Sequence, residues 1–137
     1  MATPGLVRAA TIRDRLRAAL SSRPEVRLAL LFGSHARGQE RTDSDVDVAV
    51  IAPGSDLLSL GALLSAACGR EVDVVPLDDP SIPLLEELVR DAEVIHEAQP
   101  GLAASWRSRT LAALEIDRPW FARMRDAWLA RVARDGI

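Results

Sequence analysis

Two aspartates at a two-residue spacing, Asp45 and Asp47, open an apolar segment that continues to Ile51. In a β-strand, residues i and i+2 project from the same face, so the two carboxylates are expected side by side. Crowded carboxylates repel each other, and a divalent cation relieves that repulsion. Burying two such carboxylates in a hydrophobic core would be unfavourable. The spacing therefore predicts a metal-binding position at the end of a strand.

A third acid, Asp73, lies inside another short apolar segment, which reads EVDVVPL. If the strands that carry Asp47 and Asp73 are neighbours, they lie about 4.8 Å apart, and three carboxylates can converge with Asp45 included. Mg²⁺ prefers hard oxygen ligands and keeps water and phosphate oxygens in its remaining positions. We therefore predict a magnesium site formed by these three aspartates.

A turn with phosphate-binding character follows the apolar run that ends at Phe32. Gly33 lets the backbone approach a bulky anion, and Ser34 offers a hydroxyl group and nearby N–H groups. Arg37 follows about one turn later and is a candidate for the same phosphates, while Ser44 orients the chain into the next strand and completes the candidate nucleotide-binding set. A phosphate cradle beside a metal site predicts nucleotidyl transfer, in which a hydroxyl attacks the α-phosphate of a nucleoside triphosphate and pyrophosphate leaves.

The elements around these residues indicate an α/β fold, a small mixed sheet flanked by helices and followed by a helical tail. The first strand is apolar on both faces, which predicts a central strand, and its short connection to the second predicts an antiparallel pair. A polar segment between those strands has room for a short helix at 35–38. The expected helices cover 11–22, 57–68 and 82–90, and the expected strands cover 26–32, 45–51, 72–75 and 94–96.

The character of the chain changes at 99–101, which reads QPG, so we expect a domain over 1–99 and a helical tail over 100–137. All three Trp residues of the chain lie in that tail. Pro119 is expected in the first turn of a second tail helix that Asp117 caps. The apolar surface of the tail predicts packing on the domain, or an interface with a partner or a second copy.

The composition is that of a globular domain: 137 residues, 48% hydrophobic and 27% charged. A net charge of −3 gives no general attraction to nucleic acid or to an anionic membrane, and no direct binding of nucleic acid is expected. The single cysteine, Cys68, excludes an internal disulfide and an all-cysteine zinc site. We find no signal-peptide pattern and no apolar run long enough to span a membrane, so a cytoplasmic location is expected.

Three separated stretches together resemble the nucleotidyltransferase superfamily related to DNA polymerase β. They are GSHARG at Gly33–Gly38, SDVD at Ser44–Asp47, and Asp73. The closest similarity is to the small prokaryotic branch, the minimal nucleotidyltransferases. The resemblance implies that the three aspartates ligate metal, that Asp73 also activates the acceptor hydroxyl, and that the glycine and serine of the first motif bind the triphosphate of ATP.

Members of that branch are commonly encoded beside a helical HEPN protein, an RNase toxin, and act as its antitoxin by transferring AMP from ATP to a tyrosine of the toxin. The resemblance implies this role here. The chain contains no Tyr, so the acceptor hydroxyl belongs to another protein or to a Ser or Thr of the chain itself.

Two alternatives stay open. One is a non-catalytic binding module that occludes its partner. The other is a nucleotidyltransferase that modifies a small molecule or an RNA end. The absence of a basic stripe argues against RNA, and 137 residues hardly supply a second domain to close over a small molecule.

Overall fold

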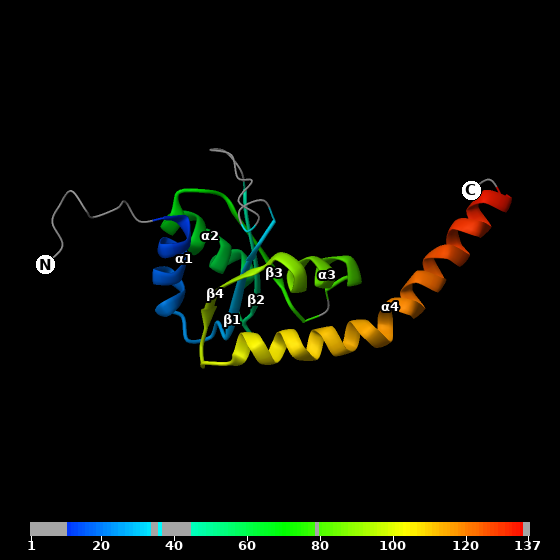
Figure 1. Ribbon diagram of the computed structural model, residues 1–137. Helices are drawn as coiled ribbons and strands as arrows, with labels where there is room; N and C mark the ends of the chain where they lie inside the picture. The colour runs from blue at the N-terminus through cyan, green and yellow to red at the C-terminus, as the bar shows by residue number, and fades with distance from the viewer. Residues whose placement is uncertain (1–10, 34–35, 37–44, 79, 136–137) are drawn as a thin grey trace, which may run out of the picture.

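The protein is a four-stranded mixed sheet with helices on both faces, as the sequence predicts (Figure 1). The computed structural model describes residues 11–33, 36, 45–78 and 80–135, except for the side chains of 116–118, 120, 121 and 135. The predicted helix at 35–38 falls mostly outside these residues. The elements in chain order are α1 (Ile12–Ser21), β1 (Leu28–Phe32), β2 (Val46–Ile51), α2 (Leu57–Cys68), β3 (Val72–Pro76), α3 (Ile82–Asp91), β4 (Glu93–Glu97) and α4 (Leu102–Asp135).

The strand order β3-β2-β1-β4 makes β1 and β2 the central strands. β1 pairs antiparallel with both β2 and β4, whereas β2 and β3 run parallel, connected through α2. The predicted antiparallel pair and the predicted edge strand at the end of the domain are both confirmed. Parallel pairing of β2 with β3 places the starts of these two strands at the same end of the sheet, where β1 ends.

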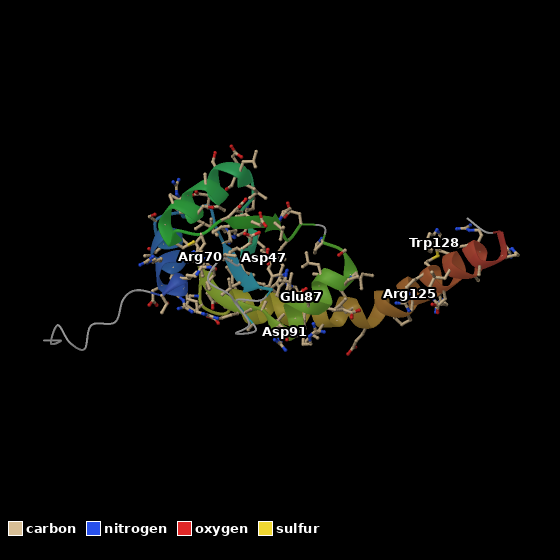
Figure 2. All side chains as sticks on the ribbon, turned by 90° about the horizontal axis from the view of Figure 1, so that it is seen from above. Asp47, Arg70, Glu87, Asp91, Arg125 and Trp128 are labelled. Atoms are coloured by element: carbon tan, nitrogen blue, oxygen red, sulfur yellow. The ribbon has the colours of Figure 1, made fainter. Side chains whose placement is uncertain are left out.

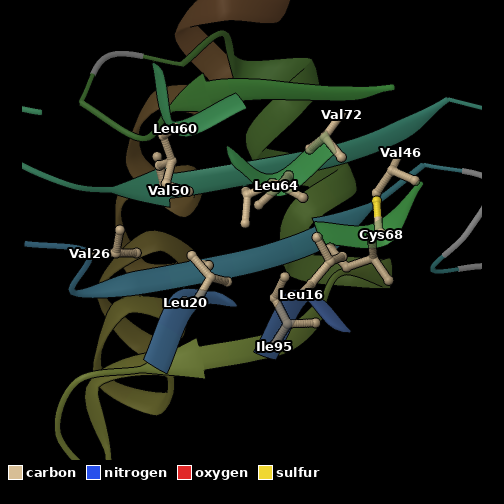
Figure 3. Packing of buried hydrophobic residues seen from close by; sticks show 13 residues of the cluster. Leu16, Leu20, Val26, Val46, Val50, Leu60, Leu64, Cys68, Val72 and Ile95 are labelled. Carbon is tan, nitrogen blue, oxygen red and sulfur yellow. The ribbon is translucent and has the colours of Figure 1, made fainter. Parts of the chain in front are cut away.

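One face of the sheet is covered by α1 and α2. Leu16 and Leu20 of α1 and Leu64 of α2 are fully buried in one cluster with alternate valines of β2, among them Val46 and Val50 (Figure 3). Burial of one such side chain stabilises the fold by about 1.5–3 kcal/mol. α1 starts where the sequence predicts, because Thr11 and the third helical residue cap each other's backbone N–H groups.

The opposite face is covered by α3 and by the first half of α4. Leu88 of α3 packs with Leu30, while Ala103 and Trp106 of α4 lie against the same cluster. Leu114, further along α4, is also buried. The first half of the predicted tail therefore contributes to the core of the domain.

The tail forms one helix, and the predicted division into two helices is wrong. α4 continues through Pro119, which lies inside it. Proline removes one backbone hydrogen bond and its ring clashes with the carbonyl of Glu115 four residues earlier, and this kinks a helix without necessarily ending it. The ribbon of α4 changes direction in the stretch that contains Pro119 (Figure 1). Among the described residues, no helix, α4 included, combines the length and the apolar character needed to cross a membrane.

The ends of α2 are fixed by Asp56 and Gly69. The Asp56 carboxylate accepts hydrogen bonds from the backbone N–H of Leu58 at 3.0 Å, the N–H of Ser59 at 3.4 Å and the Ser59 hydroxyl at 2.8 Å. These bonds, the Ser59 hydroxyl first, lower the pKa of Asp56 below its usual 3.8. Gly69 ends the helix in the left-handed region, with φ +73°.

The lowered pKa of Asp56 makes part of the stability depend on pH. The ionised cap stabilises the folded state above the unfolded-state pKa, and this contribution is lost as the pH falls through the lower folded-state pKa. We expect Asp56→Ala to melt below the native protein at pH 7, and the difference to close as the pH falls below about 3.8. Melting curves between pH 7 and pH 2.5 measure it. Asp56→Asn keeps a hydrogen-bond acceptor but does not titrate, so the difference in melting temperature between Asp56→Asn and Asp56→Ala should not change with pH. A difference that disappears at low pH would contradict this explanation.

Candidate active site

The predicted acids Asp47 and Asp73 lie side by side. In the parallel pairing of β2 with β3, Asp47 is the direct partner of Asp73, and on its other side Asp47 pairs with Phe32 of β1. Asp45 lies two residues before Asp47, immediately ahead of β2. The condition on which the predicted site depends, that the strands of Asp47 and Asp73 are neighbours, is therefore met.

Strand alternation places both carboxylates on the face that carries α3 and α4. Asp47 lies two residues before Ala49 and therefore projects from the same face, and Asp73 is related to Val75 in the same way. Ala49 and Val75 both belong to the cluster under α3 and α4. Asp73 and Asp45 are exposed, and Asp47 is half-buried. Figure 2 looks onto this end of the sheet and labels Asp47. Two of the three acids are thus exposed at this end of the sheet.

Gly33 lies directly against the Asp47 carboxylate. A Cβ atom built on Gly33 would lie 2.5 Å from Oδ2 of Asp47 and 3.4 Å from its Cγ. The backbone of Gly33 also has φ +77°, a conformation that side chains with a Cβ rarely adopt. A side chain at this position would thus adopt a strained backbone conformation and would displace the carboxylate of Asp47, a predicted metal ligand.

Ser34, Arg37 and Ser44 lie outside the described residues. Their predicted roles in binding the triphosphate and orienting the strand remain predictions.

The three aspartates offer the ligand chemistry that a hard divalent cation requires, and Asp47 and Asp73 are brought to adjacent strand positions. Within the described residues, however, no three or more His, Cys, Asp or Glu side chains are grouped closely enough to hold a metal ion. Carboxylates that share a site repel each other until a cation neutralises them. The donor set and the backbone register fit Mg²⁺, and the convergence of all three carboxylates on one ion remains a prediction.

A fourth acid at this end of the sheet, Glu71, escaped the sequence analysis. The backbone N–H of Val46 donates to the carbonyl of Glu71 at 2.9 Å, which extends the β2–β3 ladder and places Glu71 beside Asp45. Glu71 stands two residues before Asp73, so Glu71 and Asp73 repeat the two-residue spacing of Asp45 and Asp47. That repeated spacing is the sequence signal that would have identified it.

Glu93, at the start of β4, is an acid at the same end with a structural role. Its carboxylate accepts two hydrogen bonds from Nε of Arg13, at 2.8 and 2.9 Å, and one from Arg17 at 3.2 Å. These bonds attach β4 to α1. Because its oxygens already hold two guanidinium groups, Glu93 is not part of the candidate metal-binding set.

The close approach of Gly33 to Asp47 leads to a prediction with a matched control. Gly33→Ala and Gly54→Ala introduce the same side chain at nearly equal backbone angles, φ +77° and +74°, but nothing lies within 4 Å of a Cβ on Gly54. The backbone strain costs each variant about 1–2 kcal/mol. We expect Gly33→Ala to lose more stability in urea unfolding than Gly54→Ala, and to weaken Mg²⁺ binding in calorimetry. Equal losses of stability and equal Mg²⁺ affinities would refute the proposed contact.

The chain resembles known proteins in both sequence and fold. The family described as "Polymerase beta, Nucleotidyltransferase" matches residues 14–100. The protein adenylyltransferase MntA of Shewanella oneidensis is 32% identical over 82 residues, which is 56% of this chain and 58% of MntA. The similar region therefore spans less than two thirds of that relative.

Solved structures share the fold. A crystal structure of a toxin-antitoxin with AMP-PNP superposes with a TM-score of 0.68 at 23% identity, covering 85% of this chain and 98% of its own. The MntA-HepT toxin-antitoxin gives a TM-score of 0.63 at 21% identity, covering 85% and 97%. The complex of tri-AMPylated Shewanella oneidensis HEPN toxin with MNT antitoxin gives the same score and identity, covering 85% and 96%. With the family match over more than half of its length, the chain belongs to the polymerase beta nucleotidyltransferase family.

Proposed function

We propose that this protein is a Mg²⁺-dependent adenylyltransferase that moves AMP from ATP to a hydroxyl group of a partner protein. The partner we propose is a HEPN-type RNase toxin with a tyrosine acceptor, which makes this chain an antitoxin. The observation that carries the proposal is the register of Asp47 with Asp73 at the end of the sheet, with the Asp47 carboxylate against Gly33.

The relatives support the choice of donor and acceptor. MntA is named as a protein adenylyltransferase, one structural neighbour holds AMP-PNP, and another contains an AMPylated HEPN toxin. Since this chain has no Tyr, a tyrosine acceptor has to come from another protein. A cytoplasmic location, where ATP and an RNase toxin are both present, is part of the proposal.

In the proposed mechanism, the acceptor oxygen attacks the α-phosphorus of ATP, the bond to the bridging oxygen breaks, and pyrophosphate leaves. Asp73, the strand partner of Asp47, would take the proton of the attacking hydroxyl, and Asp45 and Asp47 would hold Mg²⁺ together with it. Bound Mg²⁺ would lower the pKa of the acceptor hydroxyl and stabilise the charge on the leaving oxygens. Gly33 and Ser34 would receive the triphosphate through backbone N–H groups and a hydroxyl.

Two further residues have supporting roles in this proposal. Arg37 would donate to phosphate oxygens, and Ser44 would orient the chain that enters β2. A guanidinium group can make two parallel hydrogen bonds to one phosphate, which suits it to holding a leaving pyrophosphate.

The rival functions make different demands. An occluding antitoxin needs its interface but not its carboxylates, so it predicts neutralisation by a variant without them. An enzyme for a small molecule or an RNA end predicts transfer to those acceptors and none to a protein. Each can be tested in the same reaction mixture.

The central test uses the purified protein, the product of its adjacent gene, labelled ATP and MgCl₂. We expect AMP on the adjacent gene product, located by mass spectrometry. Asp45→Asn with Asp47→Asn should reduce the transfer rate by more than the roughly 10–100-fold typical for loss of an outer-shell partner of a metal, because these residues are proposed ligands. Asp56→Asn is the control, since it removes a carboxylate remote from the site and keeps the helix cap.

The outcomes separate the candidates. Full neutralisation by the double variant, with no AMP on the partner, would establish occlusion instead. Transfer of AMP to RNA or to a small molecule, and not to protein, would assign a different acceptor. EDTA should stop transfer by the native protein, and excess MgCl₂ should restore it.

A further inference from the structure

The second half of α4, residues 119–135, is called the arm below. It leaves the body of the protein (Figure 1), and three of its large apolar side chains are exposed. Met124, Trp128 and Leu129 are 53%, 54% and 50% exposed. A concentration of exposed apolar surface on one element marks an interaction site. Trp is also the residue type that most often dominates the energy of a protein interface.

Three apolar residues of the arm form one face, from which Leu129 points away by about 100°. Met124, Trp128 and Val132 repeat at intervals of four and therefore follow one side of the helix. Arg125 and Arg131 are exposed and, by helical spacing, border that face on its two sides; Figure 2 labels Arg125 and Trp128 on this stretch. Arg125 also forms an exposed ion pair of 3.6 Å with Asp126. A helix with an apolar face and charged borders is suited to a hydrophobic groove on another protein.

The distribution of charge along the chain indicates the chemistry of the groove on the partner protein. Residues 101–137 contain seven Arg against four acidic residues, whereas the first 100 residues contain ten Arg against sixteen. The complementary surface is therefore apolar with an acidic border. Two arms that paired with each other would bring like charges together. With a net charge of −3, the chain as a whole is not attracted to an anionic bilayer.

The direction of the arm favours a partner that also reaches the catalytic carboxylates. The first half of α4 is fixed on the body by buried side chains such as Leu114. Beyond the bend near Pro119, the arm rises toward the level of the sheet end where β1 terminates (Figure 1). A protein seated on the arm would thus lie on the side of the body where Asp73 is exposed and Asp47 is half-buried.

We infer that the arm is the docking surface for the protein acceptor, which it engages through Met124 and Trp128 in an apolar groove with acidic borders. This inference rests on the proposed function only in taking the acceptor to be a protein. The arm binds the acceptor and takes no part in the chemistry, so it sets the affinity for the acceptor and leaves the affinity for ATP unchanged.

The first test replaces Met124 and Trp128 with alanine in the full-length protein. We expect the KM for the adjacent gene product to rise at least about 10-fold, as is usual when interface anchors are truncated, with kcat at saturation and the affinity for ATP unchanged. Leu58→Ala is the matched control, because Leu58 is 87% exposed but lies on α2. It should alter none of these values.

The second test examines charge. Arg125→Glu with Arg131→Glu should weaken binding of the same partner at low ionic strength and remove most of its salt dependence. Arg15→Glu with Arg27→Glu changes the net charge equally on the opposite part of the chain, and should have a much smaller effect on binding.

The third test removes Pro119 in order to straighten the bend in α4. Pro119→Ala restores a helical hydrogen bond and removes a steric clash, so the variant should melt at a higher temperature than the native protein. A straighter α4 would move the arm, and we therefore expect a higher KM for the acceptor in a more stable protein. Loss of stability cannot account for that combination.

Calorimetric binding of the adjacent gene product, measured without ATP, separates this inference from the proposed function. Transfer of AMP with unchanged KM and unchanged binding in the Met124 and Trp128 variant would overturn the docking role alone. Absence of any AMP transfer, with binding still dependent on Trp128, would overturn the proposed function alone. A native dimer that the variant converts to a monomer, or binding to anionic vesicles that the variant loses, would reassign the arm to a second copy or to a membrane.

Discussion

The contact between Gly33 and Asp47 is the constraint on which the site depends. β1 ends at the position where the neighbouring strand presents a carboxylate, and a Cβ at residue 33 would fall 2.5 Å from Oδ2 of that carboxylate. A side chain at residue 33 would have to push that carboxylate aside, and the positive φ also favours glycine there. The glycine of the turn and the aspartate of the strand are thus parts of one arrangement, although 14 positions separate them in the printed sequence.

The hydrophobic core maintains this arrangement by fixing the register of β2. A shift of one residue would move Val48 and Val50 from the face under α1 and α2 to the opposite face, and would turn Asp47 toward the buried cluster. Each valine contributes about 1.5–3 kcal/mol when buried, and an unpaired buried charge costs considerably more. These energies exceed the repulsion between exposed carboxylates at the sheet end. The core can therefore hold acids together that would otherwise separate.

The sequence predicts the features that depend on local chemistry. Alternating apolar residues lie on the expected strands, and the helix capped by Thr11 and the helix between Asp56 and Gly69 cover the predicted ranges to within one residue. The proximity of Glu71 to Asp45 depends on the parallel register of β2 with β3, and no local pattern encodes that register. The exposure of single carboxylates and the contact made by Gly33 also depend on how the strands are arranged in the tertiary structure.

The tail shows how one residue type can have opposite roles. Trp106 and Trp128 lie on the same helix, but Trp106 packs on the cluster beside Leu88, whereas Trp128 is 54% exposed. Neither the composition nor the helical spacing distinguishes the buried Trp from the exposed one. They differ because the sheet covers only the first half of α4, and the bend near Pro119 directs the remainder away from it. Since the buried half anchors the helix, the geometry of the exposed half follows from the packing of the core, and an apolar arm with basic borders is held at a defined angle to the sheet end that carries Asp47.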